Sequence, residues 1–99
     1  MYGTIARLHP RPDRIDELVA LGRQLESGGR TVAGYRLSFI FRPDKEIYDQ
    51  PTLFLIAVFD DRESYVANAE SPEQDSEFRR LRELLIDDPD WMDGTFDAL

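Results

Sequence analysis

The segment that most constrains the fold of this 99-residue chain is Leu53–Phe59, a run of seven apolar residues. Successive side chains of a β-strand point to opposite faces, so a strand with water on one side alternates apolar and polar residues. This segment does not alternate. Its two faces are Leu53, Leu55, Ala57 and Phe59 on one side, and Phe54, Ile56 and Val58 on the other. Such a strand predicts a sheet that is covered on both faces.

Three other segments are predicted to be strands. Residues 2–9 and 35–42 alternate, and residues 91–99 give a shorter and weaker pattern with Trp91 and Asp93 on one side. The residues that share a face are Tyr2, Thr4, Ala6 and Leu8 in the first segment, and Tyr35, Leu37, Phe39 and Phe41 in the second. The polar connection at residues 43–51 is long for a hairpin.

The first predicted helix begins at Pro12 or Asp13, which suit a first turn or a cap. Its apolar residues recur at helical spacing, and they are Ile15, Leu18, Val19, Gly22 and Leu25. It ends at residues 28–29, two glycines, because glycine adopts the left-handed conformation that closes many helices.

Two more helices are predicted before the last strand. Residues 60–63 have the form of a capping box, which opens one helix. Ser71 is the expected cap of the next, with Pro72 in its first turn and Gln74 reaching back. Apolar residues line one side of this last helix before residues 87–89 end it: Phe78, Leu81, Leu84 and Leu85.

The predicted order of strands and helices fits a single α+β domain over residues 1–99, a ferredoxin-like βαββαβ fold with an antiparallel sheet. All helices then lie on one face of the sheet, and they leave the apolar residues of the other face in water. Because large exposed apolar patches mark interfaces, we expect a second copy to cover that face in a two-fold homodimer.

One stretch resembles a known family. Residues 54–85 contain a strand that ends in Phe59, a helix that ends near Asn68, and then Ser71 and Pro72. This resembles the antibiotic biosynthesis monooxygenase-like domains of the dimeric α/β-barrel superfamily, with Phe59 at a position usually held by tryptophan and Asn68 where a histidine is expected. The resemblance implies cofactor-independent oxidation of hydrophobic aromatic compounds in a cavity between sheet and helices. The missing histidine also disfavours haem, and no cofactor is expected.

Three residues are candidates for catalysis. His9 is the only side chain whose ordinary pKa lies near neutrality, although a histidine at a strand end is more often a solvated surface residue. Tyr65 and Asn68 are three apart and share one helix face, so both can point into a cavity. The alternative is that Tyr65 packs in the core and that Asn68 ends its helix by bonding the backbone.

Three aromatic residues are candidates for substrate binding. Tyr35, Phe59 and Trp91 can form walls for a planar hydrophobic ligand, with core packing as the alternative for Trp91. The acidic residues at 87, 88, 90 and 93 lack the spacing of a calcium loop, so no metal site is expected. Because Asn68 stands where the family has a titratable histidine, a non-catalytic dimeric ligand-binding or structural barrel protein remains the alternative to an enzyme.

The distribution of charge limits the partners. The chain carries a net charge of −8, with 13 acidic and 4 basic residues after position 59. That excess of acid argues against binding to nucleic acid or to an anionic membrane. No cysteine is present, so disulfides and thiolate chemistry are excluded, and a cytoplasmic location is expected.

Overall fold

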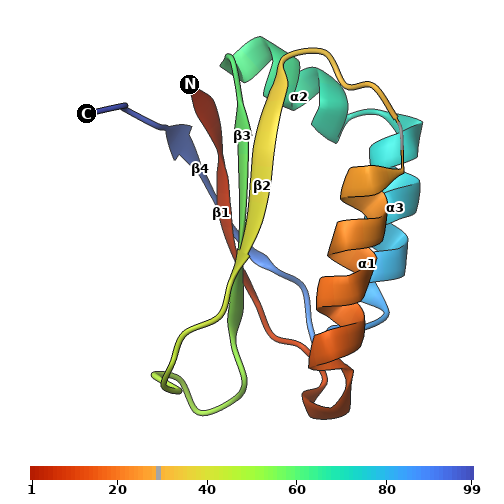
Figure 1. Cartoon of the computed structure of the whole chain (residues 1–99), viewed down its shortest axis with the longest axis vertical. Helices are drawn as coiled ribbons and strands as arrows, with labels where there is room; N and C mark the ends of the chain where they lie inside the picture. The colour runs from red at the N-terminus through yellow and green to blue at the C-terminus, as the bar shows by residue number, and fades with distance from the viewer. Residues whose placement is uncertain (29) are drawn as a thin grey trace.

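The computed structural model describes residues 1–28 and 30–99. Four antiparallel strands form one sheet in the order β2-β3-β1-β4. Figure 1 shows the helices packed on one side of this sheet, as predicted for the ferredoxin-like fold. The elements in chain order are β1 (Tyr2–Leu8), the 3-10 helix η1 (Pro12–Arg14), α1 (Ile15–Ser27), β2 (Tyr35–Phe41), β3 (Leu53–Phe59), α2 (Arg62–Ala69), α3 (Pro72–Arg82) and β4 (Asp90–Thr95).

The hydrophobic core lies between the sheet and the helices. Leu18 of α1 and Leu85, which follows α3, are fully buried against the inward residues of β1 and β3. The core residues are Ala6, Leu8, Leu18, Leu53, Leu81, Leu84 and Leu85. The predicted faces of β1 and β3 are confirmed, because residues paired across the two strands share a face and Ala6 lies opposite Leu55.

A β-bulge changes the predicted faces of β2. The register shifts between Tyr35 and Leu37, so Tyr35 pairs with Phe59 and faces the helices, whereas Leu37, Phe39 and Phe41 face away from them. The prediction that Tyr35 shares a face with these three residues is therefore wrong. An extra residue in one strand inverts the alternation at that point, and the alternating sequence gives no sign of it.

The helix boundaries follow the sequence signals with four corrections. Pro12 begins the 3-10 helix η1, and α1 begins only at Ile15. The last helix, α3, ends at Arg82, before Leu84 and Leu85. The cap of α2 is Asp61 rather than Asp60, and its carboxylate accepts a hydrogen bond from the Ser64 amide at 2.8 Å. Ser71 caps α3 as predicted, accepting from the Gln74 amide at 3.1 Å. At the end of α1, Gly28 has a φ of −70° and is not left-handed, while the prediction for Gly29 lies outside the described residues.

The face of the sheet away from the helices is largely apolar, and we call it the open sheet face. Its apolar residues, placed by strand register, are Ile5, Leu37, Phe39, Phe41, Phe54, Ile56, Val58 and Met92. Phe39 is 60% exposed and Met92 is 63% exposed. In the described part of the chain, no helix is long and apolar enough to cross a membrane.

Candidate functional site

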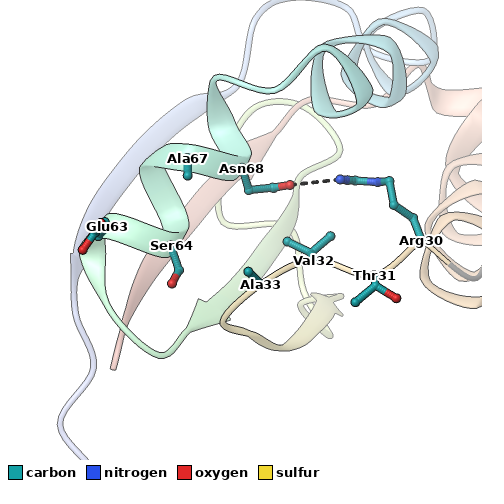
Figure 2. Close-up of a pocket in the computed structure, with 8 residues that line it drawn as sticks. All are labelled: Arg30, Thr31, Val32, Ala33, Glu63, Ser64, Ala67 and Asn68. Carbon is teal, nitrogen blue, oxygen red and sulfur yellow. Dashed lines mark hydrogen bonds between the residues drawn. The ribbon is translucent and has the colours of Figure 1, made fainter.

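A pocket of about 370 Å³ lies between α2 and the segment that leads into β2. Figure 2 shows one wall formed by α2 and the other by residues 30–33. The lining combines small apolar side chains with polar groups: Arg30, Thr31, Val32, Ala33, Glu63, Ser64, Ala67 and Asn68. It is an open surface pocket rather than an enclosed cavity.

Gly34 sets the distance between the two walls. Its φ is +75°, and the Tyr35 amide donates to the Val32 carbonyl at 3.2 Å, so the chain turns here with glycine at the position that needs a positive φ. A β-carbon on Gly34 would lie 2.3 Å from the Ser64 Oγ. The Gly34 carbonyl also accepts from the Asp60 amide at 2.7 Å. Only glycine therefore lets this segment pack directly on the first turn of α2.

Arg30 ties the segment to α2 and α3. Its Nε and Nη2 donate to the two oxygens of Glu77, each at 2.9 Å, in a bidentate ion pair. Its Nη1 donates to the Asn68 Oδ1 at 3.2 Å, and Nη2 also reaches the Gln74 Oε1 at 3.4 Å. The Glu77 carboxylate raises the pKa of Arg30, so the guanidinium remains charged. Arg30 is therefore the centre of the polar end of the pocket.

Asn68 lines the pocket. Its Oδ1 accepts from Arg30 and its Nδ2 donates to the Gln74 Oε1 at 3.2 Å (Figure 2 shows the bond to Arg30). The alternative, in which the Asn68 side chain bonds the backbone at the helix end, is wrong, because these bonds go to the side chains of Arg30 and Gln74. Gln74 does not reach back to its own helix start as predicted, because Asn68 and Arg30 hold its side chain.

Comparisons with known proteins place the fold. A scan against protein-family models and a search of curated proteins give no match. Rv0793 from Mycobacterium tuberculosis is 23% identical, covers 98% of this chain and 96% of its own, and superposes with a TM-score of 0.74. An antibiotic biosynthesis monooxygenase candidate from Bordetella bronchiseptica is 13% identical, with coverages of 98% and 97% and a TM-score of 0.79. SnoaB, a cofactor-independent oxygenase from Streptomyces nogalater, is 14% identical, with coverages of 99% and 94% and a TM-score of 0.76.

This chain has the fold of the antibiotic biosynthesis monooxygenase-like proteins. The expectation that the sequence resemblance raised is confirmed at the level of the fold. Identities this low relate the folds, and the roles of individual side chains are argued from this chain alone.

Within the monooxygenase-like fold, Tyr65 is directed to the sheet rather than to the pocket. Its hydroxyl donates to the Asp93 Oδ1 of β4 at 2.9 Å, and its ring packs edge-on against Tyr2 and Phe59. Burial first, and then the Asp93 carboxylate, raise the pKa of Tyr65 to about 12. Tyr65 is not among the described residues that line the pocket. The structure therefore separates the two members of the predicted pair, Tyr65 and Asn68.

His9 lies at the far end of the sheet from the pocket. It follows Leu8, which pairs with Leu53 at the start of β3, whereas α2 follows Phe59 at the other end of that strand. Six residue steps of about 3.3 Å separate the two ends, or roughly 20 Å. The His9 Nδ1 lies 2.8 Å from the Asp87 Oδ1, and its side chain is only 11% exposed. The structure therefore does not bring His9 and Asn68 together.

The three predicted aromatic walls lie outside the pocket. Phe59 is buried, and its ring packs edge-on between Tyr35 and Tyr65, with centroid distances of 5.4 and 5.5 Å. The Tyr35 hydroxyl donates to the Glu26 Oε2 at 2.6 Å, and burial, followed by this carboxylate, raises the pKa of Tyr35 to about 12. These rings fill the space between the sheet and the helices.

Trp91 is neither a pocket wall nor a core residue. It lies on edge strand β4, its ring contacts Phe78 of α3 at 5.9 Å between centroids, and it is 47% exposed. An edge strand has a neighbour on one side only, so a large side chain on it keeps much of its surface in water. The alternative that places Trp91 in the core is therefore wrong as well.

The acidic residues near the C-terminus are each held by a different partner. The pairs are Asp87 with His9, Asp88 with Arg82, Asp90 with Arg7, and Asp93 with Tyr65. Separate partners direct these carboxylates to separate places. No group of three or more potential metal ligands occurs among the residues that the structure describes.

Sequence reasoning missed the wall formed by residues 30–33, and Arg30 above all. Its partners Asn68 and Glu77 are 38 and 47 positions away in the sequence, so no local pattern connects them. Glu63 also lines the pocket. Its sequence context predicts only a place at the start of a helix. The one local signal is Gly34, which indicates a turn immediately before β2.

Proposed function

We propose that this protein is a homodimer that binds a small, flat, largely apolar molecule carrying an oxygen, in the pocket between α2 and residues 30–33. The contact between Arg30 and Asn68 at the polar end of the pocket carries the proposal. The cysteine-free composition supports a cytoplasmic location for it.

The two ends of the pocket support a ligand of this kind. Val32, Ala33 and Ala67 supply an apolar lining for a ring. At the other end, the Arg30 Nη1 and the Asn68 Nδ2 each carry a second N–H besides the one that bonds a neighbouring side chain. A ligand oxygen placed between these groups accepts from one or both. Apolar walls with a few placed polar groups are typical of small-molecule sites.

Cofactor-independent oxygenation in the same pocket is the second candidate. The likeness to SnoaB, over 99% of this chain, favours it. Because no cofactor supplies electrons in such chemistry, the substrate itself must give its electrons to dioxygen. N–H donors that bind the substrate oxygen can stabilise the negative charge that develops there. Binding alone remains the better supported function, since neither His9 nor Tyr65 lies in the pocket to transfer a proton.

Binding and turnover are separated by two measurements on one panel of phenols and hydroquinones. A ligand that binds only the folded state raises the melting temperature, by an amount that grows with the logarithm of its concentration relative to its dissociation constant. Oxygen uptake reports turnover. We expect stabilisation without uptake for the binding protein and both for the oxygenase. Asn68→Ala abolishes both signals in either case, and His9→Ala, roughly 20 Å away, is the matched control. A panel that leaves the melting temperature unchanged refutes the site.

The proposed dimer forms through the open sheet face. Phe39 and Phe41 are 60% and 55% exposed, and each leaves on the order of 100 Å² of ring in water. At about 25 cal/mol per Å², covering one such ring contributes about 2.5 kcal/mol. A two-fold dimer buries the same rings of both protomers. Sedimentation at micromolar concentration tests the dimer. We expect Phe39→Asp to yield folded monomers, and a wild-type protein that sediments as a monomer of 11.5 kDa refutes it.

A further inference from the structure

The connection between β2 and β3 carries two exposed apolar residues in an otherwise polar sequence. Residues 43–51 contain Ile47 and Tyr48 among charged residues, a glutamine and the flanking prolines. Ile47 is 71% exposed, and Tyr48 is 39% exposed. The connection is long for a β-hairpin, since hairpin loops usually have about two to five residues. Neither the pocket nor the hydrophobic core accounts for these two side chains.

The loop bends toward the open sheet face. In Figure 1 it curls away from the sheet on the side opposite α1 and α3. The Arg7 guanidinium lies over the Tyr48 ring at 4.8 Å from its centroid, and Arg7 is itself held by Asp90 at 2.6 Å. The register of β1 places Arg7 on the open sheet face, opposite Phe54. This cation–π contact therefore anchors the loop to that face.

The apolar surface of the sheet continues into the loop. Phe41 ends β2, contacts Phe54 with ring centroids 6.1 Å apart, and leads directly into the loop that carries Ile47. Four strands spaced about 4.8 Å apart and about 20 Å long present roughly 400 Å² in projection. A standard stable interface buries about 800 Å² of accessible surface on each partner. Contacts at the margin of the sheet therefore add to a small interface.

We infer that residues 43–51 form an arm that contacts the second copy of this chain, with Ile47 packed against the partner at the margin of the open sheet face. The inference rests on the proposed dimer. Burial of Ile47 against the partner is favourable, because contact between water and an apolar side chain of this size is costly. The Arg7–Tyr48 contact holds the arm in place before the dimer forms, which reduces the entropy lost on association.

A single introduced thiol tests the arm, because the chain has no cysteine of its own. Ile47→Cys reports on the arm, and Ile86→Cys, which follows α3 and replaces a side chain that is 44% exposed, is the matched control. The rate of modification by a maleimide is measured below and above the dissociation constant of the dimer. We expect the Ile47→Cys rate to fall by at least about tenfold at the higher concentration, since mass action favours the dimer. The Ile86→Cys rate should not change.

A second substitution connects the protection to the proposed interface. Phe39→Asp combined with Ile47→Cys should restore rapid modification at the higher concentration. If wild type sediments as a dimer and Ile47→Cys reacts equally fast at both concentrations, the arm is refuted and the dimer stands. If Phe39→Asp leaves the protection intact, the partner covers Ile47 from elsewhere and the inference is refuted. If wild type is monomeric at every concentration, the proposed dimer fails and the arm fails with it.

Discussion

Replacing Gly34 with alanine should destabilise the fold by an amount that the structure defines. Two separate costs arise. An alanine at a φ of +75° adopts a left-handed backbone conformation, which costs about 1–2 kcal/mol. Its β-carbon would also lie 2.3 Å from the Oγ and 2.5 Å from the Cβ of Ser64, and such overpacking typically costs about 1–3 kcal/mol.

The two costs together predict a loss of about 2–5 kcal/mol in the free energy of unfolding of the Gly34→Ala variant. At about 4–8 °C per kcal/mol for a domain of this size, that lowers the melting temperature by roughly 8–40 °C. Urea denaturation, followed by the fluorescence of the single tryptophan Trp91, measures the change. Gly22→Ala is the matched control. Gly22 lies within α1, and the nearest atom to its added carbon is 4.0 Å away, so alanine should raise helix stability by about 0.5–1 kcal/mol.

A double-mutant cycle separates the steric cost from the backbone cost. Ser64→Gly removes both clashing atoms, so Gly34→Ala should cost only about 1–2 kcal/mol in that background. Ser64→Ala leaves the Cβ in place and should recover little. A Gly34→Ala variant within 0.5 kcal/mol of wild type, or an equal cost in the Ser64→Gly background, would refute the packing described for this turn.

Three further predictions concern single side chains. Gly3→Ala should prevent stable folding, because its β-carbon would lie 1.9 Å from the Ala57 carbonyl oxygen; circular dichroism and urea denaturation measure the loss. The free energy of unfolding should fall as pH rises from 10 to 12. Tyr65, with its pKa raised to about 12, keeps its proton in the folded state while tyrosines of the unfolded chain ionise. In urea titrations, Tyr65→Phe should reduce this dependence of the free energy of unfolding on pH. Arg30→Ala should cost about 1–2 kcal/mol, by removal of the hydrogen bonds to Glu77 and Asn68, and should abolish ligand-dependent stabilisation in a thermal shift assay.

The fold was predictable where side chains alternate in a regular way. The inward and outward residues of β1 and β3 follow from a period of two, and the caps at Asp61 and Ser71 lie at or next to the predicted positions. Tyr35 was misplaced because a bulge adds one residue to β2 opposite β3. Whether a bulge forms depends on how two strands pair, and neither strand alone contains that information.

The candidate site was harder to predict than the fold. Tyr65 and Asn68 share a helix face, yet they lie about 4.5 Å apart along the axis of α2. That step suffices to give them different neighbours, because Tyr65 meets β4 at Asp93 while Asn68, near the end of the helix, meets Arg30. Spacing along a helix predicts direction, but the groups that a side chain reaches depend on the packing of distant segments.

The charges around the pocket argue for a neutral ligand over an anionic one. The positive charge of Arg30 is matched by Glu77 in the bidentate pair, while Glu63 adds a carboxylate to the lining, and the whole chain carries −8. A negatively charged ligand in the pocket is repelled by Glu63, at a cost on the order of 1 kcal/mol, or roughly fivefold in affinity. A phenol should therefore stabilise the protein more than a benzoate of the same size, and Glu63→Gln should narrow that difference. If the benzoate binds better, the charge of the Arg30 guanidinium is available to the ligand. That result would contradict the argument that the bidentate pair with Glu77 neutralises Arg30.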